Sequence, residues 1–257
     1  MGPRLRALQV RFLPNGWIDV GRQILVFGAA YYGYRLVRGA MDQHTTVAAF
    51  DHARSIIGVE RSLHLFIEPS VQAWTIRDAP WLNDFASWMY VNVHLPLMIG
   101  TLIWVYFFRN NAFYFVRNVF VLAMGIALIG YLVYPTAPPR LFPEWGFEDS
   151  VSNFVGFNTD TSATSALVNP FAAVPSMHVC FALIIGVSLA RLVRPRPLKI
   201  FWSLYPVVMT VVVLVTANHW WVDAALGALT ALVSALVAQA LLARARPDAW
   251  AFAGARA

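Results

Sequence analysis

Two apolar runs near the C-terminus decide the fold. They read IFWSLYPVVMTVVVLVTA from Ile200 to Ala217 and WWVDAALGALTALVSALVAQALLA from Trp220 to Ala243. A helix needs about 20 mostly apolar residues to cross the hydrocarbon core of a bilayer. Neither run alternates polar with apolar residues, as the strands of a membrane β-barrel do. The pattern therefore predicts two membrane-spanning helices in succession.

Four further apolar runs lie upstream of this pair. They cover Trp17 to Val37, Phe85 to Phe108, Asn118 to Tyr134, and a stretch from Pro175 to the basic segment at Arg191. The chain of 257 residues is 59% hydrophobic and only 12% charged, which is about half the charge of a soluble protein. We therefore predict an all-α, polytopic integral membrane protein, built as a bundle of six transmembrane helices.

Two stretches are not expected to span the membrane. Met41 to Asn83 mixes charged residues with apolar residues at three- and four-residue steps, which predicts an amphipathic helical segment at the outer interface. Leu141 to Ala173 is rich in Ser, Thr, Asn and Pro and predicts a long outer loop. We expect three parts: the first transmembrane helix with the outer segment (1–83), a catalytic five-helix core (84–243) and a cytoplasmic tail (244–257).

The distribution of lysine and arginine predicts the orientation. With six spans, twelve basic residues fall on the side that holds both termini, and six fall on the other side together with ten acidic residues. Basic loops face the cytoplasm, so we expect cytoplasmic termini and an active site on the opposite face. The net charge of +6 follows from this topology and requires no nucleic-acid partner. The single cysteine, Cys180, excludes an intramolecular disulfide and a Cys-rich metal site.

Polar residues interrupt the apolar pattern at three places on the expected outer side. Pro175-Ser176-Met177-His178 opens the fourth span, Asn218-His219-Trp220-Trp221-Val222-Asp223 opens the sixth, and the segment from Tyr134 to Arg140 follows the third. Ionisable groups near membrane depth are costly, so they are functional candidates. We expect these three segments to converge on one site.

His219 and Asp223 are four residues apart, which places both on one face of a helix within contact range. A carboxylate bonded to one imidazole nitrogen fixes the tautomer and leaves the other nitrogen to attack or to accept a proton. We expect Pro175 in the first turn of a helix, where backbone N–H groups and Ser176 form an anion site beside His178.

Arg140 is expected to bind the same anion bidentately. Two histidines, a carboxylate, a helix N-terminus and an arginine are the groups that phosphoryl transfer uses, which predicts a lipid phosphate ester as substrate. His94 and Asn218 are secondary candidates, and for His94 an interhelical hydrogen bond is the simpler interpretation. The tryptophans, Trp220 among them, are expected in an interfacial belt.

These motifs carry a family resemblance. Pro-Ser-x-His at 175–178, followed about forty residues later by His-x-x-x-Asp at 219–223, resembles the type 2 phosphatidic acid phosphatase superfamily. The runs at 134–140 and 218–223 are most similar to its inositol phosphorylceramide synthase branch, and the resemblance covers Asp84 to Ala243. It implies that His219 attacks phosphorus to form a phosphohistidine, that Asp223 orients His219, and that His178 protonates the leaving group. It implies no metal and no other cofactor.

The chain departs from the phosphatase pattern of this family in three ways. It contains no Lys-x6-Arg-Pro string, Val213 stands where the phosphatases carry an arginine, and Met177 replaces a glycine. Two phosphate-binding cations are therefore missing, so Arg140 is expected to supply more of the binding to the phosphate. This loss favours the phosphotransferase branch. We therefore expect transfer of a phosphate-bearing head group between a phospholipid and an alcohol acceptor, such as a polyol of the inositol type.

Other function classes fit parts of the same pattern. A lipid phosphate phosphatase would hydrolyse phosphatidate or a polyprenyl (di)phosphate with the same residues. A haem-binding electron carrier would use His178 and His219 as axial ligands and would show a Soret band, although a haem ligand gains little from an aspartate four residues on. A non-catalytic transporter or scaffold would turn over no phospholipid.

Overall fold

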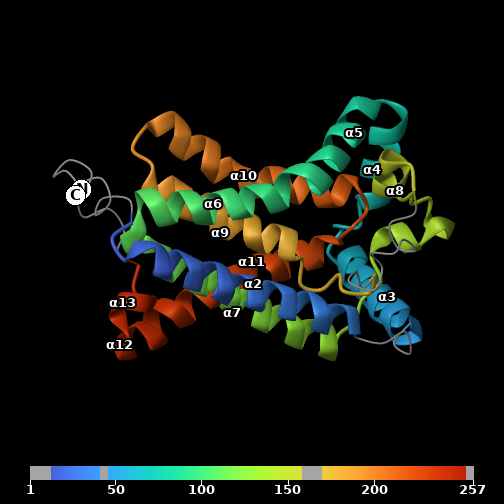
Figure 1. The fold of residues 1–257 in the computed structure, drawn as a ribbon. Helices are drawn as coiled ribbons and strands as arrows, with labels where there is room; N and C mark the ends of the chain where they lie inside the picture. Colours follow the sequence, from blue (N-terminus) through green and yellow to red (C-terminus); the bar gives the residue numbers. More distant parts are fainter. Residues whose placement is uncertain (1–12, 41–45, 158–169, 253–257) are drawn as a thin grey trace.

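The structure is a computed structural model, and it describes residues 13–40, 46–157 and 170–252. Its long helices run side by side along one direction (Figure 1). They are α2 (Gly16–Ala40), α6 (His94–Phe108), α7 (Asn110–Val133), α9 (Met177–Leu192), α10 (Arg196–Val215) and α11 (Trp221–Leu236). A π-helical turn, η2 (Met89–Val93), joins α5 (Pro80–Trp88) to α6, and another, η6 (Val237–Leu242), joins α11 to α12 (Ala243–Ala245). The all-helical prediction is confirmed for the described residues.

Helix α9 lies at the centre of this bundle (Figure 1). It packs against α6, α7, α10 and α11, and most of its residues are buried. Glycine permits two of these contacts. A Cβ on Gly186 of α9 would lie 2.6 Å from the backbone oxygen of Trp202 on α10, and one on Gly227 of α11 would lie 2.2 Å from that of Ser176. Small residues allow helices in membranes to approach this closely.

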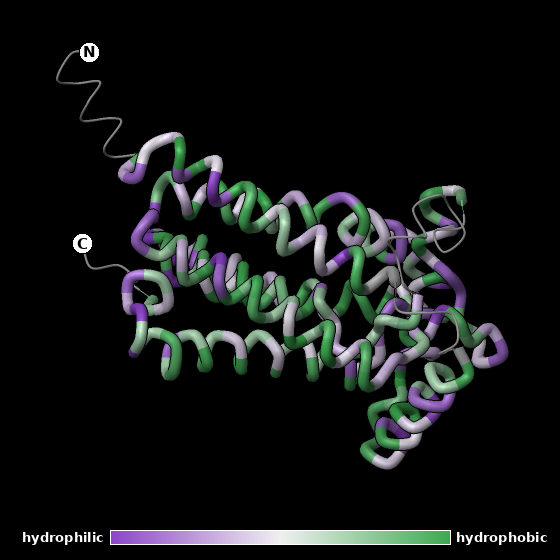
Figure 2. The backbone as a smooth tube through the Cα atoms, turned by 60° about the horizontal axis from the view of Figure 1, so that its bottom comes forward, coloured by the Kyte–Doolittle hydropathy of each residue, from purple (hydrophilic) through white to green (hydrophobic). Residues whose placement is uncertain are grey.

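Four helical segments are long and apolar enough to cross a membrane, namely Pro80–Phe108, Asn110–Val133, Arg196–Val215 and Trp221–Ala245. Large apolar side chains such as Phe201 and Leu232 are exposed on these helices. Hydrophobic residues dominate the helices, and hydrophilic segments gather mainly toward the ends of the bundle (Figure 2). The protein is therefore an integral membrane protein. The count of six spans stays a prediction, because α9 is shorter than these segments and α2 carries Asp19, Arg22 and Arg35.

Short helices gather at one end of the bundle, and α13 (Pro247–Trp250) lies at the other (Figure 1). The expected amphipathic segment forms α3 (Thr46–Ser62) and α4 (Glu68–Arg77), which pack on α11 and on α5 and α10. Its first residues, 41–45, lie outside the described residues. These two helices bring their charged residues to the same end as the starts of α9 and α11.

The segment expected as a loop, Leu141 to Ala173, contains ordered elements at the same end of the bundle. The 3₁₀ turns η3 (Pro139–Leu141) and η4 (Pro143–Trp145) precede α8 (Ser150–Val155). The loop prediction is wrong for α8, because Asp149 caps this helix: its Oδ1 accepts a hydrogen bond from Ser152 N at 3.0 Å. Residues 158–169 of the segment lie outside the described residues.

A second apolar cluster fills the space between α3, this segment and the start of α11. Trp220 is at its centre, fully buried against Phe142 and Phe147, whose rings lie at centroid distances of 5.7 Å each. The Trp220 indole donates a hydrogen bond from Nε1 to the backbone oxygen of Ala137 at 2.9 Å. Trp220 therefore belongs to the core and not to an interfacial belt, because residues 137–147 supply both its packing and its polar partner.

Candidate active site

The starts of α9 and α11 meet at the end of the bundle that holds α3 and α8. Ser176 N donates a hydrogen bond to the backbone oxygen of Asp223 at 3.0 Å. The absence of a Cβ on Gly227 lets the two helix starts approach to backbone contact at this point. Two sequence motifs about forty residues apart are therefore held together by main-chain atoms.

This contact brings the two candidate histidines together. The ring centroids of His178 and His219 are 5.9 Å apart, with an angle of 58° between the ring planes. His219 is buried, whereas His178 is partly exposed. The expected proximity of the two imidazoles is found in the structure.

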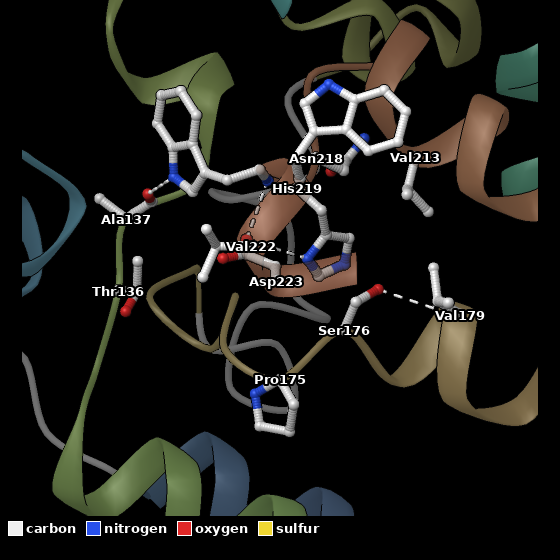
Figure 3. Close-up of polar contacts among 12 residues, drawn as sticks. Thr136, Ala137, Pro175, Ser176, Val179, Val213, Asn218, His219, Val222 and Asp223 are labelled. Atoms are coloured by element: carbon white, nitrogen blue, oxygen red, sulfur yellow. Dashed lines mark hydrogen bonds and ion pairs between the residues drawn. The ribbon is translucent and has the colours of Figure 1, made fainter. Parts of the chain in front are cut away.

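Asp223 lies directly beside His219. His219 Nδ1 is 3.4 Å from Asp223 Oδ2, and the aspartate side chain is fully buried. Figure 3 shows the His219 ring between Asp223 and the start of α9. We expected a hydrogen bond here, but the contact is at ion-pair distance, and Oδ2 also accepts from Trp220 N at 3.0 Å. The contact still directs Nδ1 at the carboxylate and leaves Nε2 as the nitrogen available to a substrate.

Ser176 caps α9. Its Oγ accepts a hydrogen bond from Val179 N at 3.4 Å, and the helix begins at Met177 (Figure 3). Pro175 therefore precedes the cap, and the prediction that it occupies the first turn is wrong, because a serine hydroxyl is the better N-cap. Apart from Val179 N, the first backbone N–H groups of α9, that of His178 among them, have no hydrogen-bond acceptor within the helix.

Arg140 and Asn218 form a pair at the turn that precedes His219. Arg140 Nη1 donates to Asn218 Oδ1 at 2.9 Å, and Arg140 N donates to the backbone oxygen of Ala217 at 2.9 Å. Arg140 Nε also lies 3.7 Å from Asp149 Oδ2. The guanidinium is thus fixed beside the residue that precedes His219, while Asp149 offsets part of its charge.

Val213 occupies the place where the phosphatase pattern has an arginine. It is buried, and its backbone oxygen accepts from Asn218 N at 3.0 Å and from His219 N at 3.3 Å. Val213 therefore supports the turn that carries His219 through its main chain and supplies no charge.

His94, the first residue of α6, lies on the far side of His178. The His94 and His178 ring centroids are 4.9 Å apart, and His94 Nδ1 is 2.9 Å from the hydroxyl of Tyr205 on α10. His94 is buried, and its Nε2 has no hydrogen-bond partner among the described residues. Tyr90 stacks on His178 at 4.2 Å. The expected interhelical hydrogen bond is present. His178 lies between the ring of His94, a secondary candidate from the sequence, and the ring of Tyr90, which no sequence motif indicated.

Two further residues were missed. Glu60 of α3 and Glu68 of α4 are fully buried and accept hydrogen bonds from Val222 N and Trp221 N, immediately after His219. Their sequence context, charged residues among apolar ones, is the same as that of the exposed Arg54 and Arg61 of α3. The two glutamates lie four residues before and four residues after the turn at His64, and only the placement of α3 and α4 distinguishes them from surface charges.

The described part of the chain shows no set of side chains placed to bind a metal ion. Within residues 13–40, 46–157 and 170–252, no group of three or more His, Cys, Asp or Glu side chains is placed to hold a metal ion. We therefore assign no metal ligands.

The fold and the site define an all-helical integral membrane protein with two histidines and a carboxylate at the starts of two packed helices. A family model described as the PAP2 superfamily matches residues 54–237, which is more than half of the chain, and the chain belongs to this superfamily. The PAP2 superfamily is a family of phosphatases and phosphotransferases, so the protein is an enzyme of this kind. Comparison with curated proteins finds no match, and comparison with solved structures also finds none.

Proposed function

We propose that the protein is a lipid phosphotransferase that acts through a phosphohistidine on His219. It would move a phosphate-bearing head group between a phospholipid and an alcohol acceptor, with a polyol of the inositol type as the expected acceptor. The observation that carries this proposal is the placement of the His178 and His219 rings, 5.9 Å apart, with Asp223 3.4 Å from His219. Membership of the PAP2 superfamily supports the phosphatase or phosphotransferase chemistry.

In the first step His219 Nε2 attacks phosphorus. The new N–P bond replaces the bond between phosphorus and the oxygen of the lipid alcohol, and protonated His178 donates its proton to that oxygen. Asp223 stabilises the positive charge that develops on His219. Arg140, Ser176 and the first turn of α9 would stabilise the phosphate oxygens.

In the second step the acceptor alcohol gives its proton to neutral His178, and its oxygen attacks phosphorus. The N–P bond breaks, and His219 returns to its starting state. The same histidine therefore serves first as acid and then as base, which a group that titrates near neutral pH can do. Water in place of the alcohol would give hydrolysis.

Two features favour transfer over hydrolysis. Val213 and Met177 stand where phosphatases of this family carry an arginine and a glycine, and both are buried apolar side chains. Asn218, beside His219, is bonded to Arg140 and to the backbone oxygen of Thr216. A site with fewer cations and more apolar surface holds less water around the phosphohistidine. We further propose that this site faces away from the cytoplasm and that the five helices of residues 84–243 form the catalytic core.

A transfer assay tests the proposal. The purified protein in phospholipid vesicles is given donor lipid labelled at the phosphorus, with and without polyol acceptors, and His219→Ala serves as the inactive control. We expect labelled head group on the acceptor and release of the lipid alcohol in equal amounts. Labelled phosphate or phosphorylated head group released to water at the same rate with every acceptor would instead establish a hydrolase. A Soret band in the purified protein, without turnover, would favour the haem-binding class.

A further inference from the structure

Two glutamate side chains, neither of them part of the histidine pair, bind to backbone N–H groups at the start of α11. Glu60 Oε1 accepts a hydrogen bond from Val222 N at 3.0 Å, and Glu68 Oε1 accepts one from Trp221 N at 3.2 Å. Both side chains are 0% exposed. The first N–H groups of a helix have no acceptor within the helix. The two glutamates therefore complete the first turn of α11, directly after His219.

A tight turn between α3 and α4 brings the two glutamates together. Leu65 N donates to the backbone oxygen of Glu60 at 2.8 Å, and His64 adopts a left-handed backbone conformation with φ of 58°. This turn reverses the chain, so Glu68 at the first position of α4 returns to Glu60 near the end of α3. The two carboxyl groups are close together, because they accept hydrogen bonds from the N–H groups of consecutive residues, Val222 and Trp221.

Three carboxyl groups thus gather on three consecutive backbone N–H groups. Asp223 Oδ2 accepts from Trp220 N, and the glutamates take Trp221 N and Val222 N. A helix N-terminus favours negative charge, but three buried carboxylates at one place repel one another. Burial, Glu68 and Asp223 raise the pKa of Glu60 to about 9, and burial raises the pKa of Glu68.

The second carboxyl oxygen of each glutamate indicates how this repulsion is relieved. Glu60 Oε2 and Glu68 Oε2 are buried, and neither has a hydrogen-bond partner among the described residues. A buried polar atom without a partner is costly. A single proton held between the two carboxyl groups would satisfy both oxygens and remove one negative charge.

We propose that Glu60 and Glu68 share one proton and together act as positioning residues for His219. The Glu60 carboxylic acid donates to the Glu68 carboxylate, and each side chain holds one N–H of the first turn of α11. Loss of the shared proton would separate the two carboxylates and shift this turn, and with it His219 relative to His178. The role given to His219 rests on the proposed function, whereas the shared proton does not.

Substitutions of Glu60 test the positioning role. Glu60→Ala should lower kcat roughly 10²-fold, the cost of a displacement of about 1 Å at the reacting groups, with little change in KM. Glu60→Gln should retain more activity than Glu60→Ala, because its amide donates to Glu68 as the acid does. Wild-type activity should decline more steeply than that of Glu60→Gln as the pH approaches about 9, because both proteins depend on protonated His178 but only the wild type also loses the shared proton. Glu144→Gln, the same change on an exposed glutamate of η4, should behave as wild type.

Other ionisable groups on the surrounding elements could also produce a pH dependence. They are His178 on α9, His219 and Asp223 at the start of α11, Arg61 on α3, Asp84 on α5, and Arg140, Glu148 and Asp149 in the segment before α8. All of them are present in both the wild type and Glu60→Gln. The difference between the two pH profiles therefore reports the glutamate pair.

Thermal unfolding supplies a readout that is independent of activity. Because the folded pKa of Glu60 is raised from 4.5 to about 9, the folded state holds a proton that the unfolded state lacks between these values. Stability must therefore fall as the pH rises across this window, and Glu60→Gln should flatten the fall in the unfolding midpoint. An equally steep fall in Glu60→Gln, or full activity of Glu60→Ala, would overturn the proposal. So would inactivation by EDTA that a divalent cation reverses, since a cation would then hold the pair.

The two proposals fail in different ways. A wild type that shows the pH-dependent unfolding but turns over no lipid phosphate would reject the proposed function and support the shared proton. A wild type that transfers phosphate, with Glu60→Ala equally active, would support the proposed function and reject the positioning role.

Discussion

His178 and His219 differ in burial, and the difference bears on their roles. His219 is buried against Asp223, and His178 is partly exposed between Tyr90 and His94. A nucleophile needs a fixed direction, which a buried carboxylate provides. An acid that protonates a departing lipid needs access to the leaving oxygen.

An activated aryl phosphate distinguishes the two roles. Its leaving group departs without a proton, so it should partly restore turnover in His178→Ala, which otherwise loses about 10²–10⁴-fold. It should leave His219→Ala inactive, because no N–P bond can form. The measurement is release of the aryl alcohol by each variant relative to the wild type. Restoration of His219→Ala alone would mean that the roles are reversed.

Asp223 is the third residue of the site. Asp223→Asn keeps the size of the side chain but removes the charge that selects the His219 tautomer, and we expect a loss of roughly 10⁴-fold in kcat. The amount of phosphohistidine trapped after a brief exposure to labelled donor lipid should fall in parallel. A variant that traps as much as the wild type would show that Asp223 acts after the first step.

At this scale the sequence predicts the proposed catalytic groups better than the residues that position them. The proximity of His178, His219 and Asp223 follows from motif spacing and from the shared end of two helices. Glu60 and Glu68 could not be predicted, because their role depends on the turn at His64 and on the packing of α3 and α4 over the start of α11. The helical periodicity of a single segment predicts neither the turn nor this packing.

At the scale of helices, the contact between α9 and α11 depends on one missing side chain. Gly227→Ala would place a Cβ 2.2 Å from the backbone oxygen of Ser176, and backbone atoms cannot move aside cheaply. We expect the helix starts to separate, with a lower unfolding temperature and an activity loss of roughly 10²-fold. Both quantities can be measured on the protein in detergent and in vesicles.

Gly125→Ala provides the matched control. Gly125 lies on an exposed face of α7, where an added Cβ meets no atom within 4 Å. Alanine in a helix is favoured over glycine by about 0.5–1 kcal/mol, so this variant should be as stable as the wild type or slightly more stable, with full activity. Equal losses in both variants would remove the special role of Gly227.

Helix starts were the least predictable elements. Pro175 was expected in the first turn of α9 and precedes the cap, and α8 was expected as loop. In both cases a side chain capped backbone N–H groups, Ser176 in α9 and Asp149 in α8. Both residue types also occur in turns and loops, so the sequence alone does not distinguish a cap from a loop residue. The long apolar helices were predictable, because their length and composition leave few alternatives.

For the whole molecule, the orientation predicted from basic residues can be measured by cysteine labelling. Cys180 is buried, so an introduced cysteine gives the dominant signal. A membrane-impermeant maleimide applied to intact cells should label Glu144→Cys at the end that holds the site. It should label Lys199→Cys, at the start of α10, only after the membrane is permeabilised. The opposite pattern would place the site on the cytoplasmic face and would require a different source of substrate.

The length of α9 has a consequence for how a lipid reaches the site. Sixteen residues rise about 24 Å, about 6 Å less than the hydrocarbon core of a typical bilayer. If α9 crosses the membrane with Arg191, Arg194 and Arg196 at the polar boundary beside Leu192, the deficit falls at the end that carries His178. The reacting phosphorus would then lie closer to the membrane centre than the surrounding head groups. A donor lipid would move slightly into the membrane to reach it and would not have to leave the bilayer. Thicker bilayers should deepen this depression and slow the exchange of lipids at the enzyme.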